Sequence, residues 1–229
     1  MIFRNVTRLG LMGGTFNPVH LGHLRAAEEL TERLRLDRLI FMPSAAPPHK
    51  PDSNLVGFDE RLHMLRLAVQ GQDKFVVSDL ENSLTKPSYT ANTLRVVSGM
   101  TDPGCRLFFL VGFDSFRTVA QWRDCSDLFR LASFAVFRRP GLGSGLDSVK
   151  EVLTPFLGAE PDVELDPDGW GGSLVWPGFQ SVLYYSGCTL EISSTDLRQR
   201  LEEGHSVRYL VPDLVREHIV GHRFYRGAT

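Results

Sequence analysis

Five short runs of apolar residues recur in the N-terminal part of the chain, with segments of helical spacing between them. The runs cover residues 9–12, 39–42, 75–77, 107–111 and 134–137. Runs this short and this uniformly apolar are typical of strands buried on both faces of a sheet, while residues 24–36 carry apolar side chains at helical spacing. The pattern predicts an α/β fold, a Rossmann-like doubly wound parallel sheet with helices on both faces.

The alternation of strands and helices stops after the fifth run. In residues 141–181, Gly, Pro and Asp are frequent and only 146–157 has helical spacing, so we expect an irregular insertion there. Residues 193–225 again have helical spacing and predict a small C-terminal helical part. The apolar face of its last helix is expected to consist of Leu214, Val215, Ile219 and Val220.

Composition limits the choice of partners and compartment. The 25 Lys and Arg residues nearly balance the 27 Asp and Glu residues of this 229-residue chain, which argues against a nucleic-acid partner. Cys105, Cys125 and Cys188 lack the spacing of a disulfide framework or a zinc site, which favours a reducing compartment. The chain has no apolar stretch of about 18 residues and no start typical of a signal peptide. We therefore expect a cytoplasmic protein without membrane contact.

Residues 13–23 have the features of a phosphate site between a strand and a helix. Gly13, Gly14, Thr15 and Phe16 follow the first apolar run, and glycines there let the backbone approach a ligand closely. The next helix would direct its free N–H groups and positive dipole end at an anion. His20 and His23 are three positions apart, so both imidazoles can reach one phosphate from the first helical turn.

Residues 192–198 have the features of a second phosphate site. They read Ile-Ser-Ser-Thr-Asp-Leu-Arg, in which the hydroxyls of Ser193, Ser194 and Thr195 precede Arg198 by about one helical turn. Hydroxyls, free helix N–H groups and a guanidinium together suit phosphate oxygens. The structural alternative is a Ser-x-x-Asp helix cap, which explains Ser193 but not the position of Arg198.

Further candidate residues are expected near the carboxyl edge of the sheet. His49 and Lys50 follow two prolines that stiffen the loop after the second strand. Thr90 and Thr93 stand near a helix start, where a Thr hydroxyl can also serve simply as a cap. Gly112, Asp114, Trp122 and Arg138 follow the fourth and fifth strands, although Trp122 taken alone is more often a core residue.

These motifs together resemble one family. Residues 13–23 read Gly-Gly-Thr-Phe-Asn-Pro-Val-His-Leu-Gly-His and resemble the signature of the HxGH nucleotidyltransferase superfamily, in which Asp is more common than Asn at position 17. A His at position 20 is typical of the nicotinate and nicotinamide mononucleotide adenylyltransferases, and residues 192–198 resemble their second phosphate motif. The resemblance implies a single nucleotidyltransferase domain over residues 1–229. It also implies transfer of AMP from ATP to nicotinate mononucleotide, which gives deamido-NAD and pyrophosphate in NAD biosynthesis.

The resemblance also implies roles for individual residues. His20, His23 and Arg198 would be catalytic. ATP would be bound by these three residues together with Gly13, Gly14, Thr15, Phe16, Gly112, Asp114, Ser193, Ser194 and Thr195. The mononucleotide would contact His49, Lys50, Thr90, Thr93, Trp122 and Arg138. No metal ligand is implied within the protein, and Mg²⁺ would accompany ATP.

Several alternatives stay open at this stage. Nicotinamide mononucleotide differs from the acid in one pyridine substituent, although residues 90–94 favour the acid. A cytidylyltransferase or a phosphopantetheine-type enzyme fits the 90–94 and 193–195 segments less well. A nucleotide-binding regulator without turnover would bind ATP without releasing pyrophosphate. A homodimer is also open, because an apolar edge on the 141–181 insertion would serve either as an interface or as a lid.

Overall fold

The computed structural model describes residues 3–45, 55–85, 87, 89–138, 145–187 and 190–226. In these residues the strands form one eight-stranded sheet in the order β3-β2-β1-β4-β5-β8-β7-β6. The strands are β1 (Arg8–Gly14), β2 (Arg38–Pro43), β3 (Phe75–Val77), β4 (Arg106–Gly112), β5 (Ser133–Phe137), β6 (Asp162–Leu165), β7 (Gly171–Val175) and β8 (Val182–Tyr185). The five predicted apolar runs are β1 to β5, which confirms their assignment.

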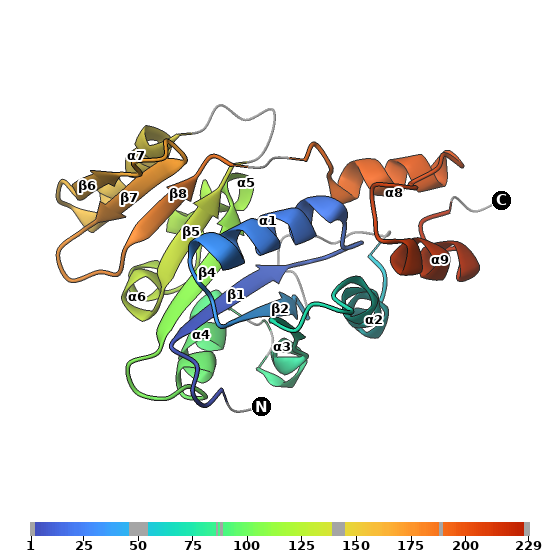
Figure 1. Ribbon diagram of the computed structural model, residues 1–229, viewed down its shortest axis with the longest axis horizontal. Coiled ribbons are helices and arrows are strands. Elements are labelled where there is room, and N and C mark those ends of the chain that lie inside the picture. The colour runs from blue at the N-terminus through green and yellow to red at the C-terminus, as the bar shows by residue number, and fades with distance from the viewer. Residues whose placement is uncertain are drawn as a thin grey trace.

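Helices cover both faces of this sheet (Figure 1). They are α1 (Leu21–Arg33), α2 (Phe58–Ala68), α3 (Leu80–Ser83), α4 (Thr90–Ser98), α5 (Phe113–Phe116), α6 (Cys125–Leu131), α7 (Leu146–Leu157), α8 (Ser194–Glu202) and α9 (Asp213–Gly221), with a 3₁₀ turn at Val119–Gln121. Among the described residues, no helix is long and apolar enough to cross a membrane.

Alternate residues of the central strands supply the cores on the two sides of the sheet. On β4, Phe108 and Leu110 pack with α1, α2, α8 and α9, whereas Phe109 and Val111 pack with α4, α6 and α7. Because side chains alternate along a strand, a strand buried on both faces must be apolar at every position. The parallel pairs run from β3 through β2, β1, β4 and β5 to β8. The predicted doubly wound α/β fold is therefore confirmed.

The prediction of an irregular insertion at 141–181 is wrong where β6 and β7 form, whereas the helix predicted at 146–157 is confirmed. Helix α7 forms over the predicted 146–157, and β6 and β7 then form a hairpin that pairs antiparallel with β8 at the end of the sheet. Glycine explains the error, because Gly171 and Gly172 read as loop residues. A Cβ on Gly171 would collide with the Tyr184 carbonyl, and one on Gly172 would lie 2.6 Å from the Glu164 carbonyl oxygen. These glycines permit close strand pairing.

The last two helices lie at the opposite end of the molecule's long axis from the β6–β7 hairpin (Figure 1). They confirm the predicted helical segment, but the predicted apolar face of α9 is only half correct. Val215 and Ile219 are buried, whereas Leu214 and Val220 are each 45% exposed. The four apolar residues cannot all face one side, because α9 packs mainly against α2 and leaves its outer side in solvent.

Candidate active site

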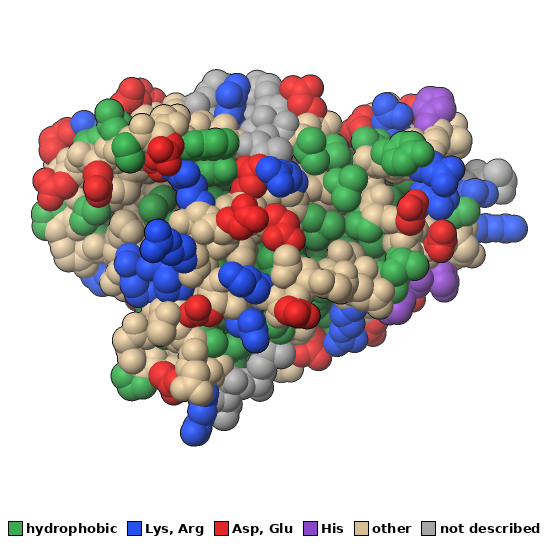
Figure 2. Space-filling view, viewed as in Figure 1, with side chains coloured by type: hydrophobic (Ala, Val, Ile, Leu, Met, Phe, Trp, Pro, Cys, Tyr) green, Lys and Arg blue, Asp and Glu red, His purple; other side chains and the backbone are tan. Residues whose placement is uncertain are grey.

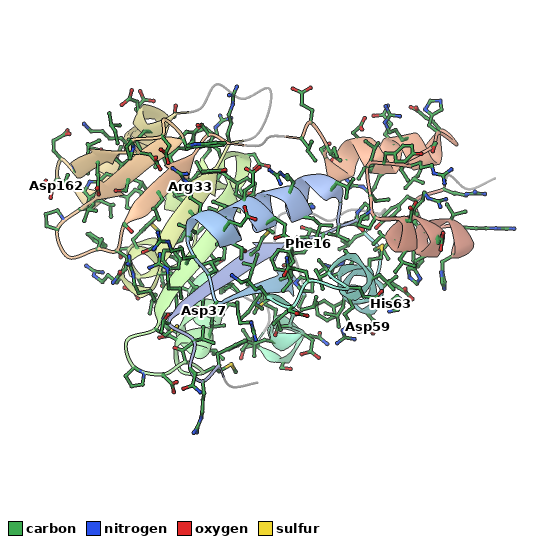
Figure 3. All side chains as sticks on the ribbon, in the orientation of Figure 1. Phe16, Arg33, Asp37, Asp59, His63 and Asp162 are labelled. Carbon is green, nitrogen blue, oxygen red and sulfur yellow. The ribbon has the colours of Figure 1, made fainter. Side chains whose placement is uncertain are left out.

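The crossing from β1 to α1 forms the base of the site. Gly13 is exposed at the end of β1, and Phe16 adopts a left-handed conformation with φ 48°. This turn folds the Phe16 ring back over Gly14, where a Cβ would lie 3.1 Å from the ring. The Asn17–Pro18 peptide is cis. Phe16 lies between the first half of α1 and the end of β1 (Figure 3).

The two predicted histidines meet at the start of α1. His20 is the N-cap residue and His23 is in the first turn, and their ring centroids are 3.7 Å apart in a stacked arrangement. The His20 main-chain N–H donates to His23 Nδ1 at 3.3 Å, and the edge of the Phe16 ring supports His23 at 5.0 Å between centroids. His20 is fully buried. The prediction that both imidazoles share one helical turn is confirmed.

Gly22 is needed at this helix start for a steric reason. A Cβ on Gly22 would lie 3.0 Å from His20 Nδ1 and 3.6 Å from the carbonyl oxygen of Ile192. The second distance also shows that the segment before α8 passes directly beside the first turn of α1. On the face shown in Figure 2, the visible histidines lie over the α8–α9 end.

The start of α8 docks on the loop before α1. The Ser194 hydroxyl donates to the Pro18 carbonyl at 3.0 Å, and Arg198 Nη1 donates to the Asn17 carbonyl at 2.9 Å. Ser193 caps α8 by accepting a hydrogen bond from the Asp196 N–H at 3.1 Å. The predicted helix cap therefore exists, but it does not explain the contacts of Ser194 and Arg198 with the loop before α1. The N-termini of α1 and α8 therefore stand next to each other, with two imidazoles and one guanidinium between them.

A third contact to this loop comes from the C-terminal segment, and sequence reasoning missed it. The Tyr225 hydroxyl donates to Asn17 Oδ1 at 2.7 Å, and the Val56 N–H donates to the same oxygen at 3.2 Å. Burial raises the pKa of Tyr225 well above its ordinary value, so the hydroxyl stays a donor. The Leu21 N–H at the start of α1 donates to the Leu210 carbonyl at 3.0 Å. Nothing in the sequence around Tyr225 signals this contact.

Arg61 is a second residue that sequence reasoning missed. It is 1% exposed on α2, and burial lowers the pKa of its guanidinium. A signal was available, because Arg61 is in helical register with the buried Leu65 and thus lies on the apolar face of an amphipathic helix. A cation on that face predicts a specific set of buried partners.

The predicted mononucleotide residues are only partly described. His49 and Lys50 lie outside the described residues. Thr90 is the first residue of α4, but Tyr89 is the N-cap residue and makes no side-chain cap, so the expectation of a Thr cap is wrong. Thr93 is buried, and its hydroxyl lies 3.2 Å from Glu81 Oε1 and 3.4 Å from the Tyr89 carbonyl.

The remaining predicted residues line the same edge of the sheet. Gly112 ends β4, which is parallel to β1, and Asp114 is exposed in the short helix α5. Trp122 is half-buried and packs edge-on against Phe109 at 6.2 Å between ring centroids. This contact agrees with the alternative that Trp122 is a core residue. Arg138 follows β5 with an exposed side chain, while its main-chain N–H donates to the Tyr185 carbonyl at 2.9 Å.

Comparison with known proteins assigns this arrangement to a family. The family model described as cytidylyltransferase-like matches residues 11–200, which include both phosphate motifs. The chain belongs to this cytidylyltransferase-like family. It is 39% identical over 221 residues to a "probable nicotinate-nucleotide adenylyltransferase" of Geobacter sp. strain M21, covering 96% of this chain and 99% of the relative.

A second relative agrees in length, and a solved structure agrees in fold. A relative with the same printed name from Pelobacter propionicus is 38% identical, over 95% of this chain and 98% of its own. The Plasmodium falciparum nicotinic acid mononucleotide adenylyltransferase, solved in complex with NaAD, superposes with a TM-score of 0.69. That alignment covers 96% of this chain and 97% of the other at 15% identity, so it shows that the two share a fold.

Proposed function

We propose that this member of the family is a nicotinate-nucleotide adenylyltransferase. It transfers AMP from ATP to nicotinate mononucleotide and produces deamido-NAD and pyrophosphate, a step of NAD biosynthesis. The full-length similarity to relatives with this printed name supports the reaction. The scattered cysteines, which favour a reducing compartment, support a cytoplasmic location.

One observation carries the chemistry of this proposal. The helix start with His20 and His23 and the helix start with Ser194 and Arg198 both contact the Asn17–Pro18 loop. Two helix N-termini placed side by side present a combined positive potential to an anion. A triphosphate fits such a place, because its charge is distributed along a chain of phosphates that can contact both helices.

The reaction requires positioning and charge stabilisation more than proton transfer. A phosphate oxygen of the mononucleotide attacks the α-phosphorus of ATP, and the bond from that phosphorus to the bridging oxygen breaks as pyrophosphate leaves. The attacking monoester has a second pKa of about 6 and is mostly dianionic at neutral pH, so it needs no general base. His20 and His23 then donate hydrogen bonds to the α-phosphate, while Ser193, Ser194, Thr195 and Arg198 hold the leaving phosphates.

The remaining predicted ATP residues have supporting roles in this proposal. The exposed main chain at Gly13 and the partly exposed main chain at Gly14 let the nucleotide approach β1, beside Thr15 and Phe16. Gly112 leaves room at the end of β4, and the carboxylate of Asp114 accepts hydrogen bonds from the ribose hydroxyls. These two groups of residues share one edge of the sheet because β1 and β4 are parallel neighbours.

Mg²⁺ enters this proposal with ATP as part of the substrate. The phosphate oxygens and water supply its ligands, because Mg²⁺ dehydrates reluctantly and is commonly held through substrate phosphates. Within the described ranges, no group of three or more His, Cys, Asp or Glu side chains is arranged to hold a metal ion. When bound, the ion would neutralise part of the phosphate charge.

The mononucleotide is proposed to occupy the edge between α4, β4 and β5. Main-chain N–H groups at the start of α4, near Thr90, suit the pyridine carboxylate. The Thr93 hydroxyl, which contacts Glu81, supports this helix start. Trp122 and Arg138 border the same edge, and His49 and Lys50 contribute from the loop after β2.

The decisive experiment is pyrophosphate release from ATP and Mg²⁺ with three acceptors tested at equal concentration. We expect nicotinate mononucleotide to react fastest, with nicotinamide mononucleotide well below it and phosphopantetheine inactive. Equal rates with both pyridine nucleotides would retain the chemistry and reject the preference for the acid. ATP binding without pyrophosphate release from any acceptor would instead indicate a nucleotide-binding regulator.

A further inference from the structure

Arg61 is a buried cation whose described hydrogen bonds all go to main-chain carbonyl groups. Its Nε donates to Val56 at 3.0 Å, its Nη1 to Thr15 at 2.7 Å and its Nη2 to Ser44 at 2.8 Å. Burying a charge is costly unless its donors are satisfied. Only a planar guanidinium has donors spread widely enough to reach three such oxygens at once.

The three carbonyl groups belong to both substrate regions of the proposed site. Thr15 is in the phosphate loop between β1 and α1. Ser44 and Val56 stand at the two ends of the stretch that contains His49 and Lys50 in the sequence. One side chain thus ties Ser44 and Val56 to the loop expected to bind ATP.

Glu81 holds the same peptide group from its other side. The Ser44 carbonyl and the Ala45 N–H belong to one peptide unit, and the Ala45 N–H donates to Glu81 Oε2 at 3.4 Å. The other Glu81 oxygen, Oε1, accepts a hydrogen bond from the Thr93 hydroxyl of α4 at 3.2 Å. A continuous chain of polar contacts therefore runs from the phosphate loop through Arg61, this peptide unit and Glu81 to the start of α4.

We propose that Arg61 and Glu81 are positioning residues that set the distance between the ATP loop and the mononucleotide site. This inference rests on the proposed function. Attack on the α-phosphorus requires the two substrates to be aligned closely, and a misplacement of about 1 Å can cost roughly 10²-fold in rate. The two residues act through the main chain, and neither needs to touch a substrate.

The primary test is Arg61→Lys, with Arg66→Lys on the exposed side of the same helix as the matched control. A lysine keeps the charge but cannot reach three carbonyls in the fork geometry. We expect Arg61→Lys to raise KM for the mononucleotide about tenfold and to lower kcat by roughly 10²-fold. The Kd of ATP alone, measured by calorimetry, should change less than the KM for the mononucleotide, because the substitution alters one contact to the ATP loop, at Thr15, and leaves the starts of α1 and α8 unchanged. Arg66→Lys should match the wild type.

Glu81→Gln provides a second test that leaves the three carbonyl contacts of the Arg61 guanidinium in place. The amide retains one acceptor oxygen in place of two, so one of the contacts to Ala45 and Thr93 is lost. We expect a several-fold rise in KM for the mononucleotide with an unchanged Kd for ATP. If Arg61→Lys fails to fold, this variant decides the question.

The outcomes separate this inference from the proposed function. If the wild type is active and the folded variants keep unchanged kinetic constants, the positioning role is overturned. It is also overturned if the constants for ATP and for the mononucleotide worsen equally. A lower melting temperature with unchanged kinetic constants would also overturn the positioning role, because a purely structural role predicts that result. A wild type that releases no pyrophosphate would reject the proposed function instead.

Discussion

Replacing Tyr225 by Phe should remove one buried hydrogen bond from the loop between β1 and α1 and leave its packing intact. The hydroxyl donates to Asn17 Oδ1 at 2.7 Å, and that oxygen keeps the Val56 N–H at 3.2 Å after the change. No buried acceptor is left unsatisfied, and the retained ring leaves no cavity. The expected loss is therefore the net value of one neutral hydrogen bond, about 1 kcal/mol. In a chain of this length that corresponds to a melting temperature lower by about 2–4 °C.

The assay is urea and thermal unfolding, together with steady-state kinetics. Tyr209→Phe is the matched control, because the Tyr209 side chain is 79% exposed and its change should stay within about 0.5 kcal/mol. Burial raises the pKa of Tyr225, so the difference should be the same from mildly acidic to mildly alkaline pH. Since Arg198 holds the Asn17 carbonyl, we expect kcat to fall only a few-fold. Unchanged stability would refute the hydrogen bond, and a loss of about 3 kcal/mol or more would refute the claim that the effect is local.

Three further changes test other parts of the reasoning. Gly22→Ala should lower kcat about tenfold, because the added Cβ would lie 3.0 Å from the His20 ring. The unfolding free energy should be nearly unchanged, because alanine favours the helix. An unchanged kcat would show that the His20 ring can move without cost. Arg198→Met should lower kcat by about 10²–10³-fold in the pyrophosphate assay, the scale of a lost transition-state donor. Asp37 lies far from this site (Figure 3), and hydrogen bonds from the Arg8 and Thr7 N–H groups lower the pKa of its carboxyl. The stabilisation that this carboxylate contributes is present above the unfolded pKa of about 3.9 and is lost as pH falls through the lower folded pKa. In urea unfolding, Asp37→Asn should therefore be less stable than wild type at neutral pH, and the difference should shrink as the pH is lowered through the folded pKa.

The sequence predicted the parts of the fold and site that depend on local patterns. Buried parallel strands are recognisable because they are apolar at every position, and the phosphate motifs combine a helix start with particular side chains. The β6–β7 hairpin was missed because its pairing depends on close approach at Gly171 and Gly172, residues that locally indicate a turn. Arg61 and Tyr225 were missed for a different reason. Their partners lie on distant segments, 46 residues away for Arg61 and Thr15 and 208 residues away for Tyr225 and Asn17.

The amide at position 17 determines how charge is distributed around the proposed phosphate site. Asn17 Oδ1 accepts hydrogen bonds from the Tyr225 hydroxyl and the Val56 N–H, and its main-chain carbonyl accepts one from Arg198. A neutral amide meets these donors without placing a negative charge beside the Arg198 guanidinium. A carboxylate at this position would attract that guanidinium and would repel the phosphates that it is proposed to hold. The C-terminal segment can thus fix the loop between β1 and α1 through neutral hydrogen bonds, which leaves the positive field of the two helix N-termini for the triphosphate.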